Sequence, residues 1–308
     1  MRSLVAGLAA AAVLLLVAGC TPSPKVPKGD GTIEPLIFMA IPSQRPGPLE
    51  ESFQPVLRML EHETGRKIRF REAHDYAEVI EGVRTGKVQI AELGPFSYVL
   101  AKQQGARITA VVARVTQKGD IPEYQSYGIT RVNSSINRLA DFRGKKICFV
   151  DENSASGYLY PKAALQDVGI SVERDIVPDF THGHDLSAIA VSNGQCDAGF
   201  AYNTIVDRRL LVQEQLKPDE LKVVWKSEMI PGGPMVIAND LPATLREQLV
   251  AALQQKANAD YLRANGFCEG ACVIADGYSY GFGSLDDAAY DKVREVCRKV
   301  GEKSCEKA

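Results

Sequence analysis

Short apolar runs alternate along this chain with longer segments in which apolar residues recur every three or four positions. Where apolar residues run together, strands are predicted over 36–41, 68–70, 88–91, 108–115, 127–131, 146–150, 175–179, 196–202, 221–225 and 235–238. Helical spacing predicts helices over 49–64, 76–85, 158–168, 184–193, 241–264 and 285–299, and one opening near Leu93–Tyr98. Strands that alternate with helices predict an α/β fold with mostly parallel sheets.

The strand and helix order begins afresh near residue 126, which predicts two lobes. We expect residues 34–125 and 226–308 to form a discontinuous first lobe and 126–225 to form the second. A chain of 308 residues is long enough for two such units. The chain then crosses between the lobes twice. In open α/β sheets a ligand binds beyond the carboxyl ends of the strands, so the cleft between the lobes is the expected site.

The first residues have the pattern of an export signal. Arg2 precedes an apolar run over Leu4–Ala18 that is too short to span a membrane. The run ends in Leu16-Val-Ala-Gly-Cys20, which resembles a bacterial lipobox; this implies cleavage after residue 19 and a lipid on the Cys20 thiol. An ordinary signal peptide with an incidental cysteine is the alternative. Residues 20–33 are rich in Pro, Lys and Gly and suit a tether, so we expect an extracytoplasmic, membrane-anchored lipoprotein.

Composition indicates which partners are disfavoured and whether the cysteines form disulfides. The net charge is −2 and no tract is rich in Lys or Arg, which argues against nucleic acid as a partner. Without Cys20 the exported chain keeps an even number of cysteines, which predicts disulfides. Candidate pairs are Cys148 with Cys196, Cys268 with Cys272, and Cys297 with Cys305, among 15 possible connectivities. A zinc site is the alternative, although no histidine lies near the last four cysteines.

The stretch 151–158 carries the strongest chemical signal. Ser154, Ala155 and Ser156 fall between the predicted strand 146–150 and the helix that follows. Hydroxyls and free backbone N–H groups would converge there at the positive end of a helix dipole, which suits an anion. The alternative is that a serine only caps the helix.

His184 precedes another predicted helix, where a neutral imidazole donates a hydrogen bond and a protonated one adds charge. A surface or capping histidine is the alternative. A hydrolase built from Ser156, His184 and Asp185 is disfavoured, because adjacent His and Asp side chains cannot easily share a triad hydrogen bond and no G-x-S-x-G elbow is present. No P-loop or metal-binding motif occurs, so we expect no cofactor, no metal and no enzymatic activity.

Several stretches together resemble the substrate-binding proteins of the phosphate, phosphite and phosphonate ABC importers. The matching stretches are Asp75–Gly82, Gly86–Ala91, Gly94–Tyr98, Glu123–Ser126, Ser154–Tyr158, Gly183–Asp185, Ala188–Val191, Asn193–Gln195 with Asp197, Val224–Ser227 and Ile230–Gly232. The most specific part is the S-x-S-G helix start followed by G-H-D, with His184 28 residues after Ser156. The resemblance runs from about Ile37 to Val300.

The resemblance implies a two-lobed periplasmic-binding-protein fold of the type with a double-crossover hinge. We therefore expect the protein to capture a small phosphorus oxyanion by hinge closure and to deliver it to an ABC permease. We also expect a monomer. The implied ligand-binding residues are Tyr76, Tyr124, Ser154, Ala155, Ser156 and His184. A binding protein for another oxyanion or small solute, an enzyme on the same fold, and a partner of a membrane sensor are the alternatives.

Two departures from the family pattern bear on the ligand. Thr204 stands near the position where binders of aminoalkyl phosphonates carry a glutamate for the amine, so a cationic ligand tail is not expected. The loop Pro231-Gly232-Gly233-Pro234 lacks an aspartate that, in many members, accepts a hydrogen bond from a protonated oxygen of the ligand. This loop weakens selection for a protonated oxyanion and admits a dianion or a bulkier group.

Overall fold

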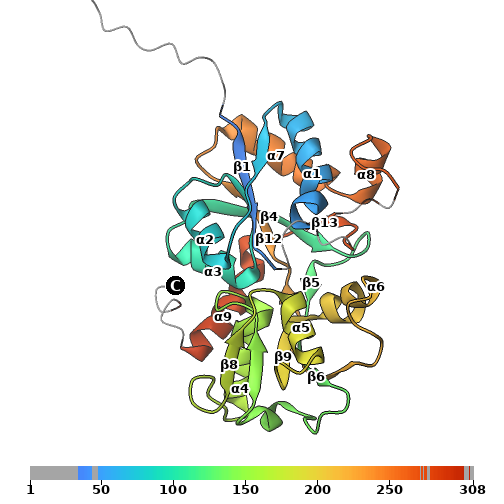
Figure 1. The fold of residues 1–308 in the computed structure, drawn as a ribbon. Coiled ribbons are helices and arrows are strands. Elements are labelled where there is room, and N and C mark those ends of the chain that lie inside the picture. The colour runs from blue at the N-terminus through green and yellow to red at the C-terminus, as the bar shows by residue number, and fades with distance from the viewer. Residues whose placement is uncertain are drawn as a thin grey trace, which may run out of the picture. The chain divides into compact units, whose positions relative to one another are not determined.

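Two mixed β-sheets organise the computed structural model, which describes residues 34–43, 48–270, 272, 274–275, 278–301 and 305. The predicted signal peptide (1–19) and the whole tether (20–33), which includes the lipidation site Cys20, lie outside these residues. The six-stranded sheet has the order β13 (Gly281–Ser284), β4 (Ile108–Val115), β12 (Pro234–Ala238), β3 (Ile90–Glu92), β1 (Leu36–Ala40), β2 (Ile68–Phe70). The five-stranded sheet has the order β10 (Leu221–Lys226), β6 (Ser126–Arg131), β9 (Ala198–Tyr202), β7 (Lys146–Phe149), β8 (Val177–Phe180). We call the sheets, with the helices that cover them, the first and the second lobe (Figure 1).

The strand directions follow the predicted α/β pattern, with antiparallel additions. In the first sheet β1 pairs in parallel with β2 and β3, whereas β12 is antiparallel to β3 and β4. In the second sheet β7 pairs in parallel with β8 and β9, and β6 is antiparallel to β9 and β10. The later strands of the first sheet, β12 and β13, pair antiparallel with its earlier strands and follow the second lobe in the sequence.

Helices cover both faces of each sheet. The first lobe carries α1 (Pro48–Thr64), α2 (Tyr76–Arg84), α3 (Pro95–Gln103), α7 (Ala243–Lys256) and α8 (Ala259–Ala264). The second carries η1 (Leu139–Phe142), η2 (Ala155–Leu159), α4 (Tyr160–Asp167), α5 (His184–Ser192), η3 (Ile205–Arg209) and α6 (Leu210–Val212). The chain continues through η4 (Asp287–Tyr290) and α9 (Asp291–Val300).

The alternation of side chains along β1 explains the layered core of the first lobe. Phe38 faces the cluster beneath α1 and α7, and its ring centroid lies 4.9 Å from that of Phe53 on α1. Met39, the next residue, faces the opposite cluster beneath α2 and α3. Successive strand side chains point to opposite faces, so an uninterrupted apolar run is what a sheet covered on both sides requires.

One helix prediction was wrong in its extent. Residues 241–264 form two helices, α7 and α8, with a break at Ala257 and Asn258. The break pairs with β13: Ala259 N–H donates to Tyr280 O at 2.7 Å, and Phe282 N–H donates to Ala257 O at 3.1 Å. The Asn258 side chain then caps α8 by accepting from Tyr261 N–H. These sheet contacts replace helical hydrogen bonds, and apolar spacing along the chain does not reveal them.

The chain passes between the lobes through a short two-stranded ladder. β5 (Glu123–Tyr124) precedes the second lobe and β11 (Ile230–Pro231) follows it, and Ile230 pairs antiparallel with Tyr124. Helix α9 adds a third link, because its buried residues join one apolar cluster with α3 from the first lobe and α4 from the second.

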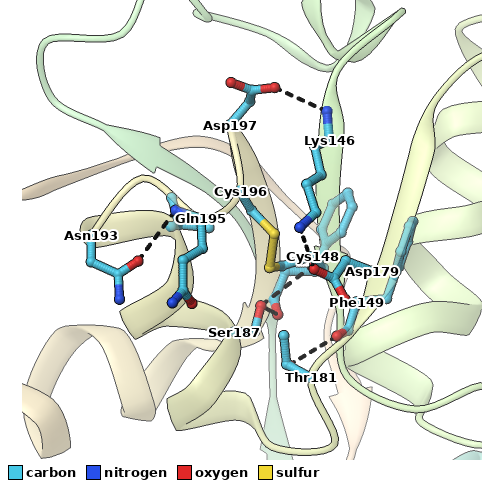
Figure 2. Close-up of a disulfide and its surroundings, with 12 residues drawn as sticks. Lys146, Cys148, Phe149, Asp179, Thr181, Ser187, Asn193, Gln195, Cys196 and Asp197 are labelled. Carbon is cyan, nitrogen blue, oxygen red and sulfur yellow. Dashed lines mark hydrogen bonds and ion pairs between the residues drawn. A yellow bond between two sulfur atoms is a disulfide. The ribbon is translucent and has the colours of Figure 1, made fainter.

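The six cysteines form the three predicted pairs. Cys148–Cys196 links β7 to the residues just before β9, and both side chains are buried. Figure 2 shows this disulfide with Ser187 beside it, whose hydroxyl donates to the Phe200 and Cys148 carbonyls. The others are Cys268–Cys272 and Cys297–Cys305. Paired cysteines offer no thiolate to a metal, which removes the basis for the zinc alternative.

Among the residues that the structure describes, no helix combines the length and the apolar character needed to cross a membrane.

Candidate functional site

A cavity of about 110 Å³ lies where the two lobes meet. One water molecule needs about 10–15 Å³ on this scale, so the cavity has room for a compact group of several heavy atoms. All six residues predicted to bind a ligand line it: Tyr76, Tyr124, Ser154, Ala155, Ser156 and His184. Four come from the second lobe, Tyr76 comes from the first, and Tyr124 comes from the connecting strand β5.

The serine turn has the predicted position between β7 and a helix, with an unexpected local geometry. Ser154 has extended backbone angles and its Oγ accepts from Gly157 N–H at 3.0 Å, so it is an N-cap. The capping interpretation is therefore correct for Ser154, and it does not compete with a site because the capped turn lines the cavity. Residues 155–159 form one π-helical turn before α4 begins. Such turns are rare and often occur at functional sites.

Two contacts hold this turn in place. A Cβ on Gly157 would lie 2.4 Å from the Val150 Cβ, so only glycine allows the turn to pack against the end of the preceding strand. The hydroxyl of Ser126, on β6, donates to the Ser156 carbonyl at 2.6 Å. The first N–H groups of a helix have no intrahelical acceptor. In η2 the Gly157 N–H is bonded to Ser154 Oγ, and Ala155 and Ser156, at the start of the turn, line the cavity.

His184 is the first residue of α5, and its ring is held in one protonation state. The Tyr202 N–H donates to Nδ1 at 3.2 Å, so Nδ1 carries no proton. Burial, and then the positive charge of Arg114, lower the His184 pKa from 6.5 to about 3. The ring is therefore neutral with its proton on Nε2, which lies 3.5 Å from Ser154 Oγ. The protonated alternative raised from sequence is excluded at neutral pH, and His184 is a neutral donor.

The same geometry argues against the Ser-His-Asp hydrolase. A catalytic histidine donates from Nδ1 to its carboxylate and accepts the serine proton at Nε2. Here Nδ1 accepts a backbone N–H, and Nε2 carries the proton. A base with a pKa of about 3 also takes no proton from a serine at neutral pH.

Two tyrosine hydroxyls add donors from the other side of the cavity. Tyr76 begins α2, and within the described residues no group hydrogen-bonds its buried hydroxyl. Burial, with a smaller effect of Asp151, raises the Tyr76 pKa well above its usual value. Burial also raises the pKa of Tyr124 to about 12. Both phenols therefore keep their protons and can donate.

Sequence reasoning missed other residues at this site. Arg114, near the end of β4, lines the cavity, as do Ser43 and Tyr202. The Ser43 carbonyl accepts from His184 N–H at 3.1 Å, which is a direct contact between the lobes. Arg114 was recognisable as the one charged residue in the apolar run Ile108–Val115.

The loop Gly232–Gly233 lines the cavity, and close packing explains why neither position carries a side chain. A Cβ on Gly233 would lie 2.4 Å from the Leu93 carbonyl oxygen, and one on Gly232 would lie 2.9 Å from the Ala113 Cβ. Close backbone packing thus excludes a side chain, an aspartate included, from either position. Thr204 also lines the cavity and offers a neutral hydroxyl.

The comparisons with a family model and with known proteins point to the same family. The family described as "ABC transporter, phosphonate, periplasmic substrate-binding protein" matches residues 38–290. The Phosphate-import protein PhnD of Mycolicibacterium smegmatis is 43% identical over 96% of each chain. The phosphonates-binding periplasmic protein of Escherichia coli is 32% identical over 70% of this chain and 64% of its own.

Solved structures show the same fold. A binding protein component of an ABC phosphonate transporter from Pseudomonas aeruginosa superposes with a TM-score of 0.74 at 27% identity, over 86% of each chain. PhnD1 from Prochlorococcus marinus, in complex with methylphosphonate, also gives 0.74, at 20% identity, over 86% of this chain and 97% of its own.

Proposed function

This chain belongs to the family of periplasmic substrate-binding proteins of phosphonate ABC transporters, and from that premise we propose that it captures a small phosphorus oxyanion for import. The observation that carries the proposal is the set of donors around one cavity. The serine turn, the neutral His184 Nε2–H and the Tyr76 hydroxyl converge there from two lobes. The buried Tyr76 hydroxyl has no acceptor among the described residues, which is costly, and an oxyanion supplies several strong acceptors at once.

We propose hinge closure as the mechanism. The cavity is lined from both lobes, and the only strands between the lobes in the described part of the chain are β5 and β11. Contacts such as Ser97 Oγ to Asn153 O, at 3.0 Å, join lobe to lobe beside the serine turn. A ligand favours the closed arrangement only through contacts that are stronger there, and donors from opposite lobes satisfy that condition.

The ligand itself is tested by calorimetry on the mature chain with Cys20 replaced by serine. Phosphate, phosphite, methylphosphonate and 2-aminoethylphosphonate are titrated, with methanesulfonate as a competitor. The names of two relatives include phosphate import and phosphonate binding, and both ligand types present the tetrahedral oxyanion that the donors suit. The aminoalkyl ligand should bind most weakly, because Thr204 offers no charge to its amine. Absence of binding to all four phosphorus compounds would reject the proposal.

The roles of the site residues are tested separately. Ser156→Ala and His184→Ala should each weaken binding by about 1–3 kcal/mol, because each leaves a charged acceptor without a partner. Ser187→Ala serves as a control, since Ser187 lies on α5 but donates its hydroxyl to Phe200 O at 2.8 Å, away from the cavity. Unchanged affinity in both site variants would remove these residues from the ligand shell.

We propose a lipid anchor at Cys20 on the evidence of the lipobox-like residues 16–20. Expression of the full chain should place it in the membrane fraction, with a diacylglyceryl adduct on the peptide that begins at Cys20. Cys20→Ser should release the protein. A soluble wild-type chain without the adduct would contradict the anchor and leave the ligand proposal untouched.

A further inference from the structure

Arg114 and Glu92 form an ion pair at the edge of the cavity. Arg114 lies near the end of β4, and its Nε donates to the Glu92 carboxylate at the end of β3. The pair reaches past β12, which lies between these strands. The Glu92 side chain is 1% exposed and that of Arg114 is 22% exposed. Arg114 lines the cavity, whereas Glu92 does not.

The chemistry of the pair differs from that of the other cavity groups. His184 is neutral, and Tyr76 and Tyr124 keep their protons, so these groups offer hydrogen bonds without charge. A guanidinium stays charged at every accessible pH and presents its N–H donors in a fixed plane. The charge also reaches the site, because Arg114 acts on the titration of both His184 and Tyr124.

We infer that Arg114 is the counter-charge for the ligand and that Glu92 positions it, so that the cavity prefers a dianionic tetrahedral oxyanion over the monoanion. The inference rests on the proposed function. Because Arg114 borders the cavity and Glu92 lies behind it, an anion meets the cation of the pair first. Close backbone packing around Gly232 and Gly233 also keeps any carboxylate acceptor for a ligand proton out of that loop.

Other titratable groups around the cavity must be separated from this effect. Those that line it are Tyr76, Glu123, Tyr124, His184 and Tyr202. Asp151 does not line the cavity but acts on Tyr76, and burial raises the pKa of its carboxyl, so Asp151→Asn is a further control. Tyr76, Tyr124 and His184 do not change charge between mildly acidic and mildly basic pH, given the direction of their pKa shifts. Glu123 is exposed and negatively charged, so Glu123→Gln is the variant that isolates its contribution.

The experiment measures the affinity for inorganic phosphate below and above its second ionisation, by calorimetry, for wild type and Arg114→Gln. Loss of a charge-assisted hydrogen bond should weaken dianion binding about 10- to 100-fold. Binding of the monoanion should weaken much less, so Arg114→Gln should prefer the dianion less strongly than wild type does. Arg114→Lys should keep part of that preference. A merely structural role would weaken both ionisation states equally.

Controls keep the result interpretable. Arg131→Gln removes a guanidinium that donates to the Val191 and Cys196 carbonyls within the second lobe and should leave the dianion preference intact. If Arg114→Gln does not fold, the double variant Arg114→Gln with Glu92→Gln avoids a lone buried charge and takes its place. Wild-type preference retained in the folded variant overturns the inference. Failure of wild type to bind any phosphorus oxyanion instead overturns the proposed function.

Discussion

At the scale of single residues, the site is built from groups whose protonation the fold controls. The Tyr202 N–H selects the tautomer of His184, and burial keeps its ring neutral. Burial keeps the protons on Tyr76 and Tyr124. These donors keep their charge state between mildly acidic and mildly basic pH, so changes in binding over that range should follow the charge of the ligand.

Tyr76→Phe should have opposite effects on binding and on stability. The variant removes a hydroxyl without a partner in the described residues, so the unliganded protein should be unchanged or slightly more stable. Phosphate binding should weaken by about 1–3 kcal/mol. Thermal denaturation with and without phosphate checks both effects. Tyr290→Phe is the matched control, because its hydroxyl donates to Gly232 O at 2.9 Å and its loss should destabilise the free protein.

The depressed pKa of His184 predicts a specific loss of stability in acid. The unfolded chain takes up a proton near pH 6.5 and the folded chain only near pH 3, so folding stability falls as pH decreases between these values. From about pH 6.5 to about pH 5 this one group should cost about 1.5 kcal/mol. Denaturant unfolding of wild type and His184→Asn measures it. The same pH slope in both proteins would show that His184 is not the cause.

At the scale of elements, disulfides and close packing fix the positions of the site residues. Cys148–Cys196 ties β7, which leads into the serine turn, to the strand that carries Tyr202. Helix α9 packs against α3 and α4, and Lys299 on α9 pairs with Asp167 at the end of α4 at 2.7 Å. These contacts come from segments far apart in sequence, and they fix the positions of short turns that could not hold a geometry alone.

The disulfides should differ in their contributions to stability. Removing Cys148–Cys196 by serine substitution should cost about 4 kcal/mol in the chain-entropy account, and removing Cys268–Cys272 about 2 kcal/mol, because they close loops of 48 and 4 residues. Denaturant unfolding of each double variant tests the order. The Cys148/Cys196 variant should also bind phosphate less tightly, since it loosens the strand before Ser154. The opposite order of stability would contradict the entropic account.

At the scale of the whole molecule, binding is expected to couple the two lobes through the crossing strands. Trp225 is the one tryptophan of the chain. It lies half-buried on β10, just before the second crossing, with its ring centroid 5.9 Å from that of Phe200. A rotation of one lobe on the other would change its surroundings without any contact between tryptophan and ligand.

Phosphate should therefore change the fluorescence of Trp225 with the same affinity that calorimetry measures, and small-angle scattering should show a more compact particle. His184→Ala, titrated over the same range, should shift the midpoint without changing the final signal. If calorimetry detects binding while fluorescence and scattering both stay constant, the cavity binds its ligand without hinge closure.

Much of this protein was predictable from local pattern. Apolar runs located the sheet strands around the site, and the serine turn and His184 were recognisable by their positions before helices. The cysteine pairs followed the predicted connectivity. These features depend on neighbours along the chain, such as strand alternation, helical spacing and capping, so the sequence carries them directly.

Only the tertiary structure decided which groups face the cavity and in what state. The pairing of Arg114 with Glu92 reaches past a strand from a much later part of the chain, and the neutral state of His184 depends on burial and on a backbone N–H 18 residues away. The break between α7 and α8 depends on pairing with β13. Charge, dielectric surroundings and sheet pairing depend on atoms from distant segments that the fold brings together. The local sequence pattern does not show which segments these are.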